Sequence, residues 1–240
     1  MKRLVLAVAL AAACSTSPSS DVESITVLAA SSLTASFTRL GADFEAAHPG
    51  THVTFSFAAS SALAQQLLAG APADVFAAAS AKSMHQVADL TSRAKPFARN
   101  VAEIAVAPGT SVTTLADLAR PGLKVALCEV AVPCGEVAEQ VLTKAHLRVR
   151  PVTRGLDVKG TLGYVLNGSA DAAIVYSTDV RAAGNRVHGI EIPSSLNAGT
   201  DYQIATLAES GHQALARAFE HFVLSSQGQA TLAHAGFLPP

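Results

Sequence analysis

Hydrophobic residues recur along the chain in two different spacings, which predict alternating strands and helices. Short runs of β-branched and apolar residues predict buried strands at 25–29, 53–57, 74–76, 101–107, 123–127, 148–152, 172–176 and 202–207. Apolar residues three and four apart, bounded by turn residues, predict helices at 33–44, 60–68, 115–119, 135–147, 158–166, 213–223 and 226–234. Such alternation is typical of a parallel sheet covered by helices on both faces.

The strand–helix scheme occurs twice, which favours two similar α/β domains over one long sheet. No stretch of linker composition separates them, and we expect the chain to cross between them twice, near 101–107 and near 202–207. The predicted discontinuous domain I therefore comprises residues 25–103 and 203–240, and domain II comprises residues 104–202. Two crossing strands form a hinge, and hinged α/β domains bind ligands in the cleft between them.

The N-terminus has the layout of an export signal. Lys2 and Arg3 precede an apolar run at 4–13 that is too short to span a membrane. Cys14 follows three alanines, as in a bacterial lipobox, although Ala11 stands where that pattern prefers Leu. We expect a signal peptide at 1–13, a lipidated Cys14 with a flexible tether over 14–24, and anchoring at the outer face of the cell membrane, in the periplasm or cell-wall space. The alternative is an ordinary cleaved signal with an incidental cysteine.

Composition limits the possible partners. The formal net charge of −1 provides no field for nucleic acid, and no mature segment reaches the length of a membrane-spanning helix, so only the lipid anchor would touch a membrane. Export gives meaning to Cys128 and Cys134, which bracket a tight loop and predict a disulfide. No further Cys or His stands at ligand spacing nearby, so we expect neither a metal site nor a cofactor.

Four turns between a strand and a helix carry small or hydroxyl-bearing residues: 30–33, 58–61, 132–135 and 156–159. Lys159 is the one Lys or Arg among them. Because a helix N-terminus leaves backbone N–H groups free and carries a partial positive charge, four such ends aimed at one point predict an anion pocket.

The candidate donors have simpler explanations as well. Ser32 and Ser60 could donate to an anion, or they could only cap their own helices. Cys134 and Val158 could contribute a main-chain N–H, or simply begin a helix. Tyr176, at the end of a strand, could contact the ligand or belong to the core.

Enzyme functions find little support in the sequence. It contains no G-x-S-x-G, P-loop or G-x-G-x-x-G motif, and no paired carboxylates at helical spacing suggest acid–base chemistry. A secreted serine hydrolase using Ser32 or Ser60 would lack an evident base. We expect Asp74, Asp157 and Asp179 to act in turns or caps.

Several stretches in order resemble the periplasmic molybdate-binding proteins of ABC importers. They are ITVLAASSLT at 25–34, FAASSALA at 57–64, GAPADVF at 70–76, VPCG at 132–135, IVYSTD at 174–179 and GF at 236–237. The resemblance implies a type II periplasmic-binding-protein fold and a monomer that delivers molybdate, or tungstate, to a membrane permease.

The resemblance also implies a set of ligand contacts. Hydroxyl and N–H groups would come from Ser32 and Ser60, a hydroxyl from Tyr176, and N–H groups from Cys134 and Val158. Relatives often have Ala at position 134 and at position 31, where this chain has Cys and Ser. Another tetrahedral oxyanion, such as sulfate or thiosulfate, remains an alternative because cavity size decides between them.

Overall fold

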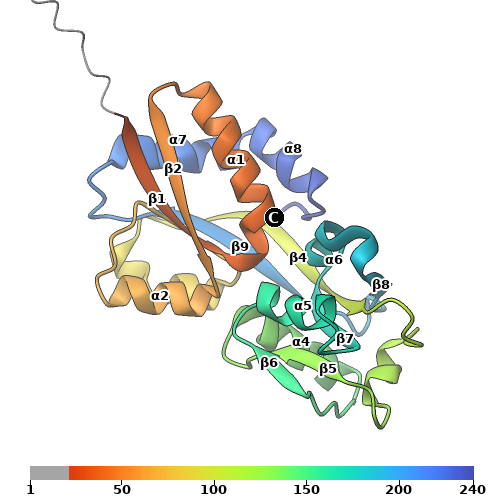
Figure 1. Cartoon of the computed structure of the whole chain (residues 1–240). Coiled ribbons are helices and arrows are strands. Elements are labelled where there is room, and N and C mark those ends of the chain that lie inside the picture. Colours follow the sequence, from red (N-terminus) through yellow and green to blue (C-terminus); the bar gives the residue numbers. More distant parts are fainter. Residues whose placement is uncertain (1–21) are drawn as a thin grey trace, which may run out of the picture.

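The computed structural model describes residues 22–240 (Figure 1). The predicted signal peptide, Cys14 and most of the tether lie outside these described residues. Within them, no helix combines the length and the apolar character needed to cross a bilayer.

The described residues form one mixed sheet of nine strands: eight follow the order β2-β1-β3-β9-β4-β7-β5-β6, and β8 pairs with β4 off this path. Their bounds are β1 Glu23–Ala30, β2 Thr51–Ala58, β3 Val75–Ala78, β4 Lys95–Val106, β5 Val125–Cys128, β6 Thr153–Gly155, β7 Ala172–Tyr176, β8 His188–Glu191 and β9 Gly199–Thr206. Strand β1 pairs in parallel with β2 and β3, and β5 pairs in parallel with β6 and β7. The long strands β4 and β9 pair with each other and with their other neighbours in antiparallel fashion.

Eight α-helices connect or flank the strands. They are α1 Thr34–Ala47, α2 Ser60–Leu68, α3 Ala81–His85, α4 Pro133–Lys144, α5 Val158–Leu166, α6 Ser177–Ala183, α7 Gln213–Leu224 and α8 Ser226–His234, together with 3-10 helices at Ser31–Leu33, Ala88–Leu90, Leu115–Ala119 and Gly184–Arg186. The stripe predicted for α1 is buried: Leu33, Phe37, Leu40 and Phe44 have no exposed surface.

The buried residues divide the molecule into two lobes. Lobe I is built from residues 22–101 and 199–240, and its sheet has a core on each face: Val75 and Ala77 join the core under α1, α7 and α8, whereas Phe76 and Ala78 join the one under α2 and α3. Lobe II, residues 102–198, has a second core, which Ala59 of lobe I also joins. Alternate side chains of a strand point to opposite faces, so one short strand contributes to both cores of lobe I.

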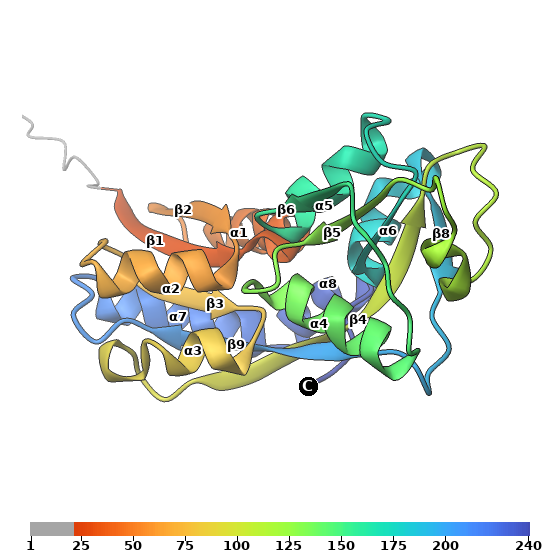
Figure 2. The ribbon, with the colours of Figure 1, turned by 90° about the horizontal axis from the view of Figure 1, so that it is seen from below.

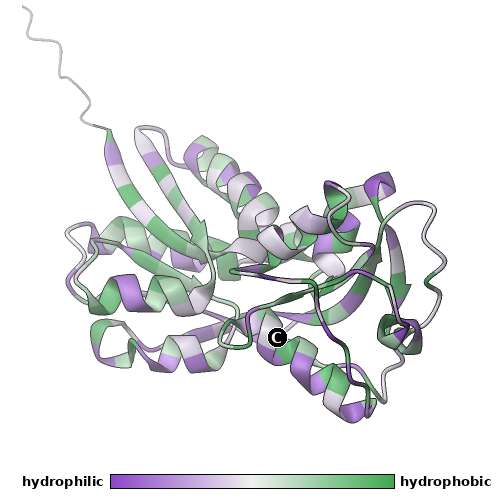
Figure 3. Cartoon of the chain, turned by 60° about the horizontal axis from the view of Figure 1, so that its bottom comes forward, coloured by the Kyte–Doolittle hydropathy of each residue, from purple (hydrophilic) through white to green (hydrophobic). Residues whose placement is uncertain are grey.

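Strand β4 belongs to both lobes. Its first part pairs with β9, and residues 102–106 pair with β7 and β8. Figures 1 and 2 show β4 and β9 running side by side from one lobe to the other. Figure 3 shows hydrophobic residues concentrated along the strands and hydrophilic residues mainly on the outer helices and loops.

Two features of the predicted element pattern were wrong. The strand expected at 148–152 is irregular, and the strand lies instead at Thr153–Gly155. Pro151 has no N–H for a sheet ladder, which explains why pairing begins only after it. The short elements α3, α6 and β8 were not predicted, because segments of four to seven residues carry too little periodicity.

Candidate functional site

A small cavity lies between the lobes at the carboxyl ends of β1, β2, β5 and β7, and the five predicted ligand residues all line it. The volume of this cavity is about 10 Å³. Its lining residues are Ala30, Ser31, Ser32, Ala58, Ala59, Ser60, Ala79, Val132, Pro133, Cys134, Asp157, Val158 and Tyr176. Figure 2 shows α2 of lobe I facing α4 and α5 of lobe II. The turns predicted to converge on one point therefore do converge.

Ser60 is the first residue of α2, and it does not cap that helix. The N-cap position belongs to Ala59, and no side chain caps the N-terminus. The Ser60 Oγ instead accepts a hydrogen bond from the Ala79 N–H at 2.9 Å. Because a hydroxyl has one proton, and an N–H can only donate, the Ser60 proton remains available for another acceptor.

Ser32 likewise makes no cap. It lies in the 3-10 helix Ser31–Leu33, whose N-cap is Ala30 without a side-chain bond. Its Oγ lies 2.8 Å from the Tyr202 Oη, on strand β9. Neither Ser32 nor Ser60 therefore caps its own helix, and the alternative explanation as caps is wrong.

Lobe II presents main-chain groups at the same cavity. Helix α4 begins at Pro133, so Cys134 lies in its first turn, and α5 begins at Val158. The first N–H groups of a helix have no acceptor within it and attract negative charge. Asp157 is the N-cap of α5, and its Oδ1 accepts from the Gly160 N–H at 2.8 Å, as expected for a cap.

The start of α4 is held against the end of β5. Cys128 and Cys134 are joined by an S–S bond, with their Cα atoms 5.8 Å apart. A Cβ added to Gly135 would lie 1.9 Å from the Glu129 carbonyl oxygen, so only glycine allows the loop to approach this closely. The position of the Cys134 N–H thus depends on a covalent link and on a close backbone contact.

Tyr176 ends β7 and is 2% exposed. Among the described residues, its buried hydroxyl has no hydrogen-bond partner. Burial is the main cause that raises the pKa of Tyr176 well above its usual value, and neighbouring Tyr202 adds to it, so the phenol keeps its proton. A buried hydroxyl without a partner costs about 1–3 kcal/mol, and the Tyr176 hydroxyl can donate to an acceptor placed in the cavity.

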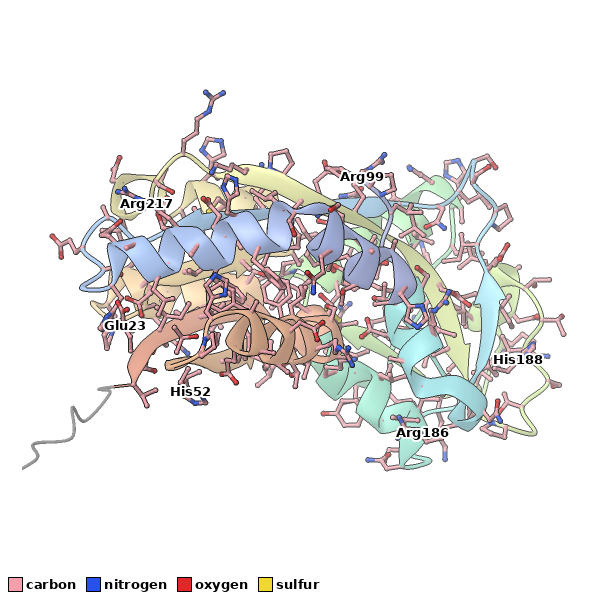
Figure 4. All side chains as sticks on the ribbon, turned by 90° about the horizontal axis from the view of Figure 1, so that it is seen from above. Glu23, His52, Arg99, Arg186, His188 and Arg217 are labelled. Carbon is pink, nitrogen blue, oxygen red and sulfur yellow. A yellow bond between two sulfur atoms is a disulfide. The ribbon has the colours of Figure 1, made fainter. Side chains whose placement is uncertain are left out.

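Among the described residues that line the cavity, Asp157 is the one with a charged side chain. No Lys, Arg or His is among the lining residues of the described chain. The Lys159 Nζ, in the first turn of α5, lies 2.9 Å from the Asp179 Oδ1, whose side chain is fully buried. Burial raises the pKa of Asp179, and Lys159 opposes that effect. The charged residues labelled in Figure 4 lie at the outside of the molecule.

An ion pair also joins the two lobes beside the cavity. The Lys82 Nζ of α3 bonds the Glu136 carboxylate of α4, across a groove that shares Pro133 with the cavity. Within residues 22–240, no three His, Cys, Asp or Glu side chains gather as a metal site would require.

Three contributors to this site were not predicted from the sequence. Ala79 acts through its main chain, which no side-chain pattern reveals. Asn100 and Tyr202 lie on the crossing strands and join the cavity through buried hydrogen bonds. Asn100 directly precedes the strand predicted at 101–107, and a polar residue at the edge of a strand expected to be buried was the available signal, since buried polar groups need partners.

Comparisons with known proteins agree with this architecture. Residues 25–238 match the family described as "Bacterial extracellular solute-binding protein". The molybdate-binding protein ModA of Mycobacterium tuberculosis (strain ATCC 25618 / H37Rv) is 38% identical over 228 residues, covering 93% of this chain and 87% of that protein.

Two solved structures share the fold, and they confirm the predicted fold class. The periplasmic molybdate-binding protein of Azotobacter vinelandii has a TM-score of 0.81 and 20% identity, with 90% of this chain and 99% of that chain covered. The sulfate-binding protein SubI from Mycobacterium tuberculosis H37Rv has a TM-score of 0.78 and 21% identity, with 90% and 87% covered. The chain belongs to the family of bacterial extracellular solute-binding proteins, in which it is a relative of ModA, and it is a binding protein and not an enzyme.

Proposed function

We propose that this protein captures molybdate, and tungstate about equally, and delivers it to the membrane permease of an ABC importer. The observation that carries the proposal is the buried Tyr176 hydroxyl without a partner, in a cavity where donors from both lobes meet. The 38% identity to a molybdate-binding protein supports the choice of ligand.

The proposed contacts suit a dianion that carries no proton. A buried anion without a cation beside it needs many hydrogen bonds. Ser32, Ser60 and Tyr176 would each donate a hydroxyl proton, and Cys134 and Val158 would each donate a main-chain N–H. Hydrogen phosphate would need an acceptor for its proton, and Asp157, whose Oδ1 caps α5 by accepting from Gly160, is the one carboxylate that the described chain places in the lining.

We further propose that the lobes close on the ligand. The moving units would be domain I, residues 25–103 and 203–240, and domain II, residues 104–202, with the hinge in β4 and β9. Separate cores in the two lobes support this division, and the Lys82–Glu136 pair would hold the closed form. Closure should reduce the radius of gyration when molybdate is added.

The remaining proposals concern the setting in which the protein works. Lipidation of Cys14 would anchor a monomer to the outer face of the cell membrane, in the periplasm or cell-wall space. The Cys128–Cys134 bond is consistent with such an oxidising compartment.

Calorimetric titration with molybdate, tungstate, sulfate, thiosulfate and phosphate tests the function. We expect binding of the first two and rejection of phosphate. Tighter binding of sulfate or thiosulfate would favour the alternative within this class. If none of the oxyanions bound, the proposal would be wrong.

Tyr176→Phe tests the observation behind the proposal. A hydrogen bond to a charged group contributes about 1.5–3 kcal/mol, so its loss should weaken molybdate binding roughly 10- to 150-fold. Tyr164→Phe is the matched control, because Tyr164 lies on α5 and does not line the cavity. Equal affinities of the two variants would contradict the proposed contact.

A further inference from the structure

A chain of buried hydrogen bonds runs from Ser32 into the crossing strands. The Ser32 Oγ lies 2.8 Å from the Tyr202 Oη. The Asn100 Nδ2 donates to the Tyr202 Oη at 3.4 Å and to the Thr178 Oγ1 at 2.7 Å. Asn100 is 1% exposed and Tyr202 has no exposed surface, so water does not compete for these groups. The chain therefore joins a cavity residue of lobe I to both crossing strands and to α6 of lobe II.

The direction of these bonds follows from one main-chain group. The Asn100 Oδ1 faces the Val101 N–H at 3.1 Å, and a backbone N–H can only donate. The Ser177 hydroxyl also donates to this oxygen, at 3.1 Å. The amide nitrogen of Asn100 is therefore the atom that faces Tyr202, where it can act only as a donor.

The proton of Tyr202 then has one place to go. Its oxygen accepts from Asn100, and the remaining neighbour is the Ser32 oxygen, so Tyr202 donates to Ser32. Burial is the main cause that raises the pKa of Tyr202, and the phenol keeps its proton. With its oxygen occupied as an acceptor, Ser32 has its own proton free for the cavity.

We infer that Tyr202, held by Asn100, is a positioning residue that directs the Ser32 proton into the cavity, so that Ser32 donates to the bound anion, and that this orientation favours fully deprotonated oxyanions. The inference rests on the proposed function. The Ser60 proton is likewise free for the cavity, because the Ser60 oxygen accepts from the Ala79 N–H and that N–H cannot accept in return. Each serine of lobe I thus accepts one hydrogen bond from within the protein and has its own proton left for the cavity.

The consequence is discrimination against a protonated anion. Hydrogen phosphate carries a proton that needs an acceptor, and a buried proton without one is penalised. Without the Tyr202 hydroxyl, the Ser32 hydroxyl is no longer held with its proton toward the cavity, and it can rotate to accept the proton of hydrogen phosphate. The loss of the Tyr202 hydroxyl should therefore weaken molybdate binding and lower the ratio of molybdate affinity to phosphate affinity.

The first test compares Tyr202→Phe with the control Tyr164→Phe, with phosphate measured by competition. We expect Tyr202→Phe to weaken molybdate binding about 3- to 10-fold, as for one neutral hydrogen bond, and to lower the ratio of molybdate to phosphate affinity by about tenfold. A merely structural role would weaken both anions alike and leave the ratio at its original value, which would overturn the inference.

A double-mutant cycle asks whether Tyr202 acts through Ser32. In a Ser32→Ala background, Tyr202→Phe should change the affinity by less than about twofold, because the group it positions is gone. Independent, additive losses would contradict the inference. The cycle uses whichever oxyanion the unaltered protein binds most tightly, so failure of molybdate in that first titration overturns the proposed ligand, while the cycle still decides the role of Tyr202.

Discussion

The two lobes supply the same kind of donor by different means. Lobe I presents the Ser32 and Ser60 hydroxyls, whose oxygens are occupied by Tyr202 and by the Ala79 N–H. Lobe II presents helix starts whose useful groups are main-chain N–H groups, together with the Tyr176 phenol. Residue identity should therefore matter most in lobe I, whereas the path of the backbone should matter most at the helix starts of lobe II.

Lobe II has more interactions than lobe I that hold the backbone in place at its helix starts. The S–S bond and the close approach of Gly135 to Glu129 hold the start of α4. The Asp157 cap and the Lys159–Asp179 pair hold the start of α5. In lobe I, the comparable constraints act on the hydroxyl oxygens. The comparison can be tested by substitutions that separate side-chain chemistry from backbone position.

Lys159→Met should have the largest effect on stability. It leaves Asp179 fully buried without its cation, and breaking such a pair costs about 3 kcal/mol. Loss of Lys159 should raise the pKa of Asp179 further, because Lys159 now opposes the effect of burial. The folded state would then bind the Asp179 proton more tightly than the unfolded state, so stability should rise as pH falls from neutral toward that raised pKa.

Urea unfolding of Lys159→Met at pH 8 and pH 5 measures this effect, with the larger defect expected at pH 8. Lys124→Met is the control, because Lys124 is exposed, and it should change stability by less than about 0.5 kcal/mol. If stability were unchanged but anion binding were lost, lobe II would hold the anion by a cation. The contrast between the two lobes drawn above would then be wrong.

Ser60→Ala and Ser32→Ala should each weaken molybdate binding roughly 10- to 150-fold, the value of a hydrogen bond to a charged group. Ser60→Ala also leaves the Ala79 N–H without its acceptor. Ser61→Ala, one residue further along α2 and not lining the cavity, is the control for calorimetry. If both cavity variants titrated like the unaltered protein, the two serines would not be ligand contacts.

Opening the bond between Cys128 and Cys134 should lower the free energy of unfolding by about 2 kcal/mol, because the closed loop is short. The N–H of Cys134 remains, so we expect only a several-fold loss of affinity as the loop relaxes. Thiol labelling of the denatured, unreduced protein checks the bond itself. Two free thiols at these positions, in material from the native compartment, would remove the predicted disulfide.

Much of the fold was predictable because its helices carry clear apolar stripes. The segments α5, α8 and β7 have the bounds that the periodicity predicted. The antiparallel pairing of β4 and β9 was not predicted, since register and direction depend on contacts distant in sequence. The strand expected at 148–152 failed because alternating exposure occurs there without a ladder of hydrogen bonds.

The residues proposed to contact the anion could be predicted from the sequence, whereas the residues that orient them could not. The turns at the strand ends marked all five proposed contacts, because small residues before a helix leave its N–H groups accessible. The groups that orient the serines were not marked. Tyr202 and Asn100 lie about 170 and 68 residues from Ser32 along the chain, and only the folded structure brings their polar atoms together.

Val158→Ala should have the smallest effect on binding. It tests whether the start of α5 contributes through its main-chain N–H alone. The substitution keeps the N–H at the start of α5, so molybdate affinity should change by less than about twofold. The side chain is 2% exposed, so stability should fall by about 1–2 kcal/mol through lost packing. Val165→Ala, on the same helix and 3% exposed but away from the cavity, should show the same loss of stability. If Val158→Ala weakened binding tenfold while the two variants were equally destabilised, the Val158 side chain itself would shape the site, and lobe II would depend on residue identity as lobe I does.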